Sequence, residues 1–371
     1  MADLISVEDC EAIEYAYAQG WTDGLPVVPP TRDRVSSMLA AAAIDAEHVL
    51  GAVPERRRLI TAGIAAANAV MAGCRPEYFP LVLAALEATL DPAFKLNTVT
   101  TSTGGAAICV IFSGPMAEAV GMNGKHNALG TGNRANATIG RALRLVASNA
   151  LGAKTGRLDA TSIGHPGKFT LCFVEDAPPL PWLPLRVQQG YSPGDTTVTV
   201  IGTEGPRQVA NQLSERPEDV LASFVVQMKT ASSFIVGKGG QCVVVLGHEH
   251  ALAIRQAGWT QQQAREYLHR HSRVLPGELA AGGIHLERGA QHDMSVGPDG
   301  RIATFRSVED IILVTAGGPG AGWSAYLPTW APTLHSRAVV RRVRVPGEAL
   351  PDCGPDGCAL PMGLAGPAAE A

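Results

Sequence analysis

The chain has 371 residues, of which 46% are hydrophobic and 17% are charged, and its formal net charge is -4. This composition allows a large buried core in one or two domains. No basic stripe with interleaved aromatic residues occurs, which argues against nucleic acid as a partner. The 7 cysteines are scattered and odd in number, a pattern typical of a reduced cytoplasmic protein rather than of a disulfide framework.

The sequence also argues against a membrane partner. Its first residues, MADLISVEDCEAIEYA, are acidic and lack the cationic and apolar regions of a signal peptide. The most apolar stretch, residues 59–73, contains Asn68 and is too short to span a bilayer. We therefore expect a cytoplasmic protein.

The first half of the predicted structure begins with helices and continues with strands. Helices are expected at residues 7–19, 32–43, 56–72 and 76–90, and strands at residues 98–102, 106–112 and 168–174. Between the last two strands, a glycine-rich loop leads into a further helix.

A proline-rich crossing at residues 178–184 separates the predicted halves. After it, strands are expected at residues 196–201, 241–246, 310–315 and 337–345, and helices at residues 208–213, 217–230, 249–257 and 261–272. The predicted domains are residues 1–177 and 178–346, followed by a mobile Pro/Gly-rich tail at residues 347–371.

The two halves look alike. Gly104 and Gly105 precede a buried strand with Cys109, and residues 239–240 precede a buried strand with Cys242, 133 positions after Cys109. The sequence therefore predicts an α/β fold of two similar halves and suggests an internal duplication. A ligand cleft is then expected between the halves, where strand ends converge. The alternative stays open, because any α/β protein repeats strand, glycine and helix.

The clearest signal of a binding site is a glycine-rich loop that runs directly into an amphipathic helix. Unpaired N–H groups and the dipole at a helix start favour a bound anion, and Lys125 and Arg134 add positive charge there. Gly130 and Gly132 would let the backbone approach a ligand, and Asn133 would cap the helix. We predict that these residues bind a carboxylate or phosphate. A helix connection without a ligand is the alternative.

The same segment matches the dinucleotide-binding pattern G-x-G-x-x-A at residues 130–135. That pattern requires a buried strand immediately before its first glycine. The preceding residues, NGKHNAL, are polar and turn-like instead. An NAD-dependent oxidoreductase is therefore less favoured than a lyase or hydrolase, and no cofactor is predicted.

Candidate groups for acid–base chemistry lie in several loops. His165 and Lys168 belong to the turn GHPGK and are expected to face the pocket of Lys125 and Arg134. An imidazole exchanges protons near neutral pH, and a buried ammonium can hold or deprotonate a substrate. The alternative is a solvent-exposed turn that Pro and Gly merely shape.

His250 and Asp23 are the other predicted catalytic residues. His250 lies where a buried strand meets a helix, and Asp23 lies in the rigid loop WTDG, where it would serve as a second proton-transfer group or cap the turn. The segment around His250 does not predict a metal site, because it lacks H-E-x-x-H and no third ligand is fixed.

A second glycine-rich loop follows a buried strand at residues 317–324. It lacks G-K-[ST], but its backbone would approach a ligand closely, with hydroxyls from Ser324 and Tyr326. Cys353 and Cys358 are not spaced as C-x-x-C, and a thiol role for them is kept as an alternative.

Four phrases together resemble a known group: GWTDGLPVVPPT, GCRPEYFPLVLAALEA, GNRANATIGRALRL and GHPGKFTLCF. The chain resembles, over roughly residues 20–345, a poorly characterised bacterial family associated with the UGSC-motif selenoprotein and thioredoxin-like group. The resemblance implies no secure activity. The Sec-Gly-Ser-Cys motif itself is absent, which weakens any redox role taken from the group.

These observations predict an enzyme of small-molecule metabolism. Its substrate carries a carboxylate or similar anion, and acid–base chemistry would perform an elimination, addition or hydrolysis. The alternative is an accessory or redox subunit that works with a thiol-dependent partner protein. A homo-oligomer is also compatible with the sequence.

Overall fold

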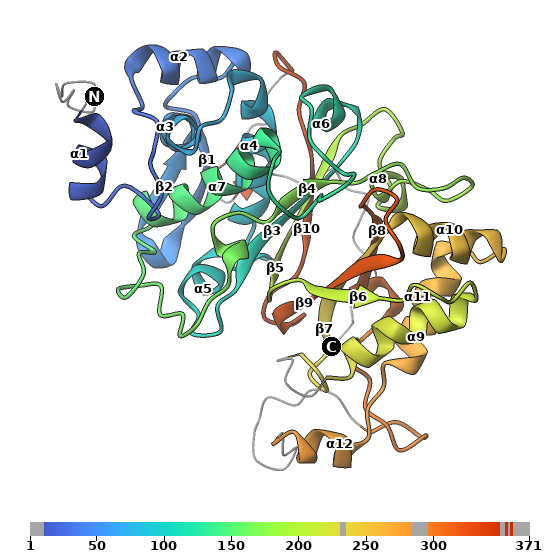
Figure 1. Ribbon diagram of the computed structural model, residues 1–371. Coiled ribbons are helices and arrows are strands. Elements are labelled where there is room, and N and C mark those ends of the chain that lie inside the picture. Colours follow the sequence, from blue (N-terminus) through green and yellow to red (C-terminus); the bar gives the residue numbers. More distant parts are fainter. Residues whose placement is uncertain (1–10, 231–234, 284–295, 349–352, 355–356, 359–371) are drawn as a thin grey trace.

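The computed structural model describes residues 11–230, 235–283, 296–348, 353–354 and 357–358, and it has a mixed α/β fold (Figure 1). Most of the tail predicted at residues 347–371 lies outside the described residues. The dominant element is an eight-stranded sheet.

The elements before the proline-rich crossing are mostly helical. The helices are α1 (Ala12–Ala18), α2 (Arg32–Ala41), α3 (Ala62–Ala72), α4 (Phe79–Leu90), α5 (Leu96–Thr101), α6 (Pro115–Ala119) and α7 (Arg134–Asn149). The strands are β1 (Val49–Val53), β2 (Arg58–Thr61), β3 (Ala107–Ser113) and β4 (Cys172–Val174). The 3-10 turns are η1 (Pro54–Arg56), η2 (Pro76–Tyr78) and η3 (Pro166–Lys168).

The elements after the crossing contribute most of the sheet. The strands are β5 (Thr197–Thr203), β6 (Arg207–Ala210), β7 (Gly240–Leu246), β8 (Ile311–Thr315), β9 (Trp323–Pro332) and β10 (Val339–Arg342), with a separate hairpin of β11 (Cys353–Gly354) and β12 (Gly357–Cys358). The helices are α8 (Leu185–Gln188), α9 (Pro217–Met228), α10 (His248–Gln256), α11 (Gln261–His271) and α12 (Pro276–Ala281), and the 3-10 turn η5 is Val308–Asp310.

Two central strands have the same kinds of neighbour. β3 is parallel to β4 and antiparallel to β5, and β7 is parallel to β8 and antiparallel to β9. The two sets join where Thr203 pairs with Thr329. β6 follows β5 in the chain but pairs with β9, and β10 follows β9 but pairs with β5. Strands from both sides of the predicted domain boundary therefore share one sheet.

The two ends of the strand order β4-β3-β5-β9-β7-β8 come together. The N–H of Asp176, just after β4, donates to the carbonyl of Thr315 at the end of β8 (2.8 Å), and the Thr315 hydroxyl donates to the Asp176 carbonyl (2.7 Å). Alternate strand residues such as Cys109, Phe173 and Val243 form one apolar cluster between the strands. The outer faces pack against α3, α4 and α7 at one end, and against α9, α10 and α11 at the other (Figure 1).

Three predicted elements are corrected by the structure. Residues 98–101 lie in helix α5 rather than in a strand, and Ser102 follows the helix end. A threonine hydroxyl can bond within a helix, and Thr100 Oγ1 donates to the Leu96 carbonyl (2.8 Å). Residues 208–210 lie in strand β6, so no helix forms at residues 208–213; β6 is a strand because it pairs with the distant β9. The helix predicted from residue 56 begins only after Thr61, and β2 precedes it.

Strand β9 has no counterpart among the predicted elements. None of the helices in the described part of the chain is long and apolar enough to cross a membrane.

Candidate functional site

Helix α7 carries or contacts three of the predicted site residues of the first half, namely Asp23, Asn133 and Arg134. Asn133 caps the helix by accepting the N–H of Asn136 (3.0 Å), which confirms the predicted cap. Buried Ile139 and Leu143 lie on its apolar face. Its polar side chains contact loops that are distant in the sequence, so the phrases that carry the family resemblance meet along this helix.

Asp23 is held by Arg141 of α7 in a two-pronged ion pair. Arg141 Nε donates to Asp23 Oδ2 (2.8 Å) and Nη2 donates to Oδ1 (2.7 Å). The same nitrogen also donates to the carbonyls of Leu25 and Pro26. Asp23 Oδ1 accepts the N–H of Leu25 as well (3.3 Å). Because both carboxylate oxygens already have donors, this geometry fixes the loop and gives no support to proton transfer by Asp23.

A buried ion network lies beside the second half of α7. Arg144 Nη2 donates to Asp159 Oδ2 (2.8 Å), and Lys168 Nζ donates to Asp159 Oδ1 (3.0 Å) and to Thr161 Oγ1 (2.5 Å). The exposed fractions of the side chains are 14% for Arg144, 15% for Lys168 and 2% for Asp159. Two cations thus share one carboxylate, and the network keeps one positive charge in excess.

Burial and neighbouring charge shift the pKa values in this network. Burial lowers the pKa of Lys168, and Arg144 adds to the effect, while Asp159 opposes it. Burial alone would raise the pKa of Asp159, but hydrogen bonds from Thr161 and Lys168 and the charge of Arg144 lower it. Burial and the charge of Lys168 lower the pKa of His165. His165 is therefore mainly neutral at pH 7.

A shallow pocket adjoins this network, and its volume of about 310 Å³ includes space that is open to solvent. Arg144 and Lys168 both line it, and none of its lining residues is acidic. The full lining is Thr100, Ala106, Ala107, Ile108, Gly140, Arg144, Gly167, Lys168, Phe169 and Thr170. We call it the cationic pocket. His165 lies in the adjacent turn, where its Nδ1 accepts the N–H of Gly167 (3.2 Å).

The glycine-rich loop lies at the opposite end of α7. Arg134 and Arg144 are ten residues apart, or about 15 Å along a helix. The turn with Lys168 precedes β4 and lies at the amino ends of the parallel strands β3 and β4, whereas the glycine-rich loop lies beyond their carboxyl ends. The expectation that His165 and Lys168 face the same pocket as Lys125 and Arg134 is therefore corrected.

Around the start of α7, the predicted anion-binding residues have structural partners. Arg134 Nε donates to the Gly73 carbonyl (3.0 Å). The side chain of Asn127 occupies the space that a Cβ at Gly130 would need, and Gly132 has a positive φ of +107° that favours glycine. Lys125 is exposed. The structure of the loop itself therefore requires glycine at positions 130 and 132, whether or not a ligand binds there. Anion binding at this loop stays a prediction.

The two glycine-rich loops contact each other at the carboxyl ends of the strands. Gly317 donates its N–H to the Gly124 carbonyl (2.7 Å), and His126 Nε2 lies 2.8 Å from the Pro319 carbonyl. Gly320 donates its N–H to the Glu249 carboxylate (2.7 Å). We call this contact region the loop seam.

His250 and Ser324 form a buried pair next to the loop seam. His250 Nδ1 lies 2.6 Å from Ser324 Oγ, and His250 Nε2 lies 2.9 Å from the carbonyl of Asn211. Ser324 Oγ also accepts the N–H of Gly247 (2.9 Å). Burial lowers the pKa of His250. With both ring nitrogens engaged and 2% of the residue exposed, His250 ties α10 to its neighbours, and catalysis by it gains no support.

Tyr326 lies in the apolar cluster beneath α9, α10 and α11. It is fully buried, its hydroxyl has no hydrogen-bond partner among the described residues, and the guanidinium of Arg207 lies 6.0 Å from its ring centre. The predicted contact between this hydroxyl and a substrate gains no support from this position.

A buried carboxyl group escaped the sequence analysis. Ser113, the last residue of β3, donates its hydroxyl to Glu175 Oε2 (2.5 Å), and the N–H of Leu185 donates to both carboxylate oxygens (2.9 Å each). Burial raises the pKa of Glu175 to about 7. The signal was an acidic residue directly after an apolar strand. Arg144 and Asp159 were also missed, because no spacing rule links a helix residue to an irregular loop.

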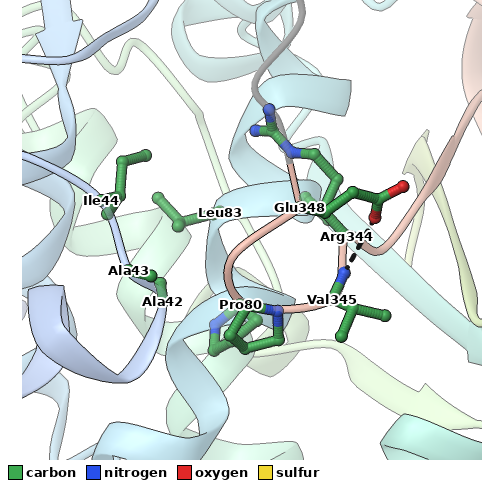
Figure 2. A pocket seen from close by; sticks show the side chains of 10 residues that line it. Ala42, Ala43, Ile44, Pro80, Leu83, Arg344, Val345 and Glu348 are labelled. Carbon is green, nitrogen blue, oxygen red and sulfur yellow. Dashed lines mark hydrogen bonds between the residues drawn. The ribbon is translucent and has the colours of Figure 1, made fainter.

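A further hollow lies between the end of α2, helix α4 and residues 344–348 (Figure 2), and its volume of about 400 Å³ includes space that is open to solvent. Most of its lining residues are apolar. Its two charged residues have partners: Arg344 pairs with Glu87, and Glu348 accepts the N–H of Val345 (3.2 Å) and pairs with Arg342. None of the predicted site residues lines it.

Among the described residues, no group of three or more His, Cys, Asp or Glu side chains is placed to hold a metal ion.

Comparisons of the chain with protein-family models and with curated proteins find no match. The resemblance to the UGSC-motif group therefore stays a prediction.

Proposed function

We propose that this protein is an enzyme of small-molecule metabolism, a lyase or hydrolase, that binds a carboxylate-type anion in the cationic pocket. The proposal rests on one observation: Arg144 and Lys168 both line a pocket while a single carboxylate, Asp159, holds them in place. Convergent polar groups with shifted pKa values beside a pocket are typical of functional sites.

In this proposal, Arg144 binds the substrate anion. Its Nη2 donates to Asp159 and to the Ala153 carbonyl (3.1 Å), while its Nε and Nη1 have no protein partner among the described residues. The neutral imidazole of His165 exchanges a proton, and the ammonium of Lys168 donates one or stabilises developing negative charge. These roles fit an elimination, addition or hydrolysis.

Turnover and calorimetric titration with a panel of small organic acids test the proposal. We expect Arg144→Ala and Lys168→Ala to bind the anion roughly tenfold more weakly or worse, because each removes a hydrogen bond to a charged group. Arg157→Ala is the matched control, since Arg157 is an exposed cation of the same segment. Thermal unfolding checks that each variant folds. Activity that survives both Lys168→Ala and His165→Ala would exclude this site.

We also propose that the units around β3 and β7 arose by duplication and that a ligand site lies between them. The shared pattern of one parallel and one antiparallel neighbour supports this idea. Apolar side chains fill the space between the strands, so such a site would lie at the loop seam. An experimental structure tests both parts: the two units would superpose strand for strand, and a soaked anion would bind at the seam.

The alternative role, a thiol-dependent accessory subunit, is favoured by one observation. Cys353 and Cys358 are direct partners across the β11–β12 hairpin. Directly opposed residues in antiparallel strands have Cα atoms about 4.5–5.5 Å apart, a range compatible with a disulfide. Mass spectrometry of the alkylated protein, with and without reductant, tests this role. A protein active alone, with Cys353→Ser and Cys358→Ser both silent, would exclude it.

A further inference from the structure

We infer that Ser113, Glu175 and Thr197 form a pH-sensitive relay of hydrogen bonds at the carboxyl end of β3. The hydroxyl hydrogen of Ser113 points to Glu175 when that carboxyl group is ionised, and to Thr197 when the carboxyl group carries a proton. The proton state of Glu175 then decides how Arg186 of α8 is held. This device is separate from the cationic pocket, which adjoins the amino end of β3.

The hydrogen bonds in the structure are those of an ionised Glu175. Ser113 Oγ donates to Glu175 Oε2 (2.5 Å), and the N–H of Leu185 donates to both carboxylate oxygens (2.9 Å each). Ser113 Oγ also accepts from the N–H of Arg186 (3.3 Å) and from its Nη1 (3.2 Å). A hydroxyl group has one hydrogen and two lone pairs, so this arrangement uses the full hydrogen-bonding capacity of Ser113.

The carboxyl group of Glu175 occurs in both proton states near neutral pH. The residue is 6% exposed, and burial disfavours the ionised form of a carboxyl group. Two charged groups act on it from neighbouring helices: Arg186 of α8 lowers its pKa, and Glu118 of α6 raises it. Burial has the largest effect and raises the pKa of Glu175 to about 7.

Thr197 is placed to accept the hydrogen of Ser113 in the protonated state. A protonated Glu175 donates its hydrogen to Ser113 Oγ, which must then donate its own hydrogen elsewhere. Thr197 lies directly opposite Ser113 in the ladder of β3 and β5, and side chains in such pairs have Cβ atoms about 4.5–5.5 Å apart. Rotation about χ1 therefore brings the two hydroxyls into contact. Thr197 is fully buried, and its hydroxyl has no hydrogen-bond partner among the described residues.

Protonation of Glu175 also changes the contacts of Arg186. In the protonated state, Ser113 Oγ faces three donors, namely the carboxyl group and the two N–H groups of Arg186, but it has two lone pairs. One hydrogen bond from Arg186 is therefore lost, together with the negative charge beside its guanidinium. Arg186 keeps the bond from Nε to the Pro193 carbonyl (2.9 Å). A fall in pH thus loosens α8 where it follows the proline-rich crossing.

Titration of Glu175 by NMR tests the relay, in protein with isotope-labelled glutamate side chains and with Glu175→Gln to identify the signal. We expect Ser113→Ala to raise the titration midpoint by about one pH unit, because the ionised form loses a donor. Thr197→Val should lower the midpoint by roughly half a pH unit, because the protonated form loses an acceptor. Thermal unfolding checks that each variant folds.

Thr203→Val is the matched control. Thr203 lies on the same face of β5 as Thr197, is equally buried and also has a hydroxyl without a partner among the described residues. It pairs with Ala107 at the opposite end of β3, so its replacement should leave the midpoint of Glu175 unchanged.

Opposite shifts from Ser113→Ala and Thr197→Val are the signature of the relay. If Thr197→Val leaves the midpoint unchanged or raises it, or if Thr203→Val lowers it equally, the relay is wrong. A wild-type midpoint near the ordinary value of 4.5 also overturns it. Hydrogen exchange of α8 relative to α9 measures the effect on Arg186: we expect α8 to exchange relatively faster below the midpoint, and an unchanged ratio would contradict the coupling.

Discussion

The charged side chains at the two ends of α7 differ in their burial and in their partners. At the start, Arg134 donates to a backbone carbonyl and Lys125 is exposed. Near the other end, Arg144, Lys168 and Asp159 form a largely buried network beside a pocket. The glycine-rich helix start is the more conspicuous sequence signal, yet buried charge collects at the far end. The start of α7 thus holds neighbouring loops together, and its other end contributes Arg144 to a candidate binding site.

The largest expected effect comes from removing the carboxylate of the network. Asp159→Ala leaves two largely buried cations without their partner and should lower the free energy of unfolding by about 3–5 kcal/mol. Urea denaturation measures this. Glu77→Ala is the control, because it breaks a surface pair with Arg75 (3.7 Å) and should cost about 1 kcal/mol or less. If the two variants lower the free energy of unfolding by the same amount, the buried network contributes no more to stability than the exposed pair, and the prediction is wrong.

Glu175 is a buried carboxyl group that is held by hydrogen bonds from Ser113 and Leu185 and not by two neighbouring cations. Its pKa is about 7 in the folded protein, above the ordinary value of 4.5. The ionised form is thus disfavoured by folding, and stability falls as pH rises from 4.5 to 7 and is constant above. Glu175→Gln should remove this fall and raise stability at pH 8 by on the order of 3 kcal/mol at most. Urea denaturation at pH 5 and pH 8 measures the change. An unchanged pH dependence would contradict the assignment.

The buried pair near the loop seam should give a smaller effect. His250→Ala leaves the Asn211 carbonyl and the Ser324 hydroxyl without a partner, at a cost of about 1–3 kcal/mol. Since the pKa of His250 is lowered, its contribution exists above the ordinary pKa of the unfolded chain and is lost as pH falls through the folded value. Thermal unfolding between pH 5 and pH 8 checks both points. If turnover disappears while stability and fold are unchanged, the pair is catalytic and not merely structural.

The smallest effect on stability is expected at the start of α7. Arg134→Ala removes one hydrogen bond of an exposed residue and should cost about 1 kcal/mol or less, with the fold intact. Titration with sulfate compares the two ends directly. If Arg134→Ala weakens sulfate binding more than Arg144→Ala does, the anion site lies at the helix start and the comparison is reversed.

Local patterns predicted the parts of the fold that depend on local physics. Buried strands β3, β7 and β8 are continuous apolar runs, and helices α7, α9 and α11 follow clear periodicities. β6 and β9 could not be predicted in this way, because they are strands only through partners that are remote in the chain. The same holds for the residues of the candidate site. His165 and Lys168 could be selected from one short turn of the sequence, whereas Arg144 and Asp159 come close to Lys168 only in the folded chain.

The exchange of β6 and β10 between the two strand sets has a consequence for synthesis of the chain on the ribosome. β5 pairs with β10 through residues up to Arg342, and Asp91 pairs with Arg341 of that strand. A nascent chain therefore carries an open strand edge on β5 until residues 339–342 have emerged. Such late pairing slows folding and leaves an edge on which other chains can assemble.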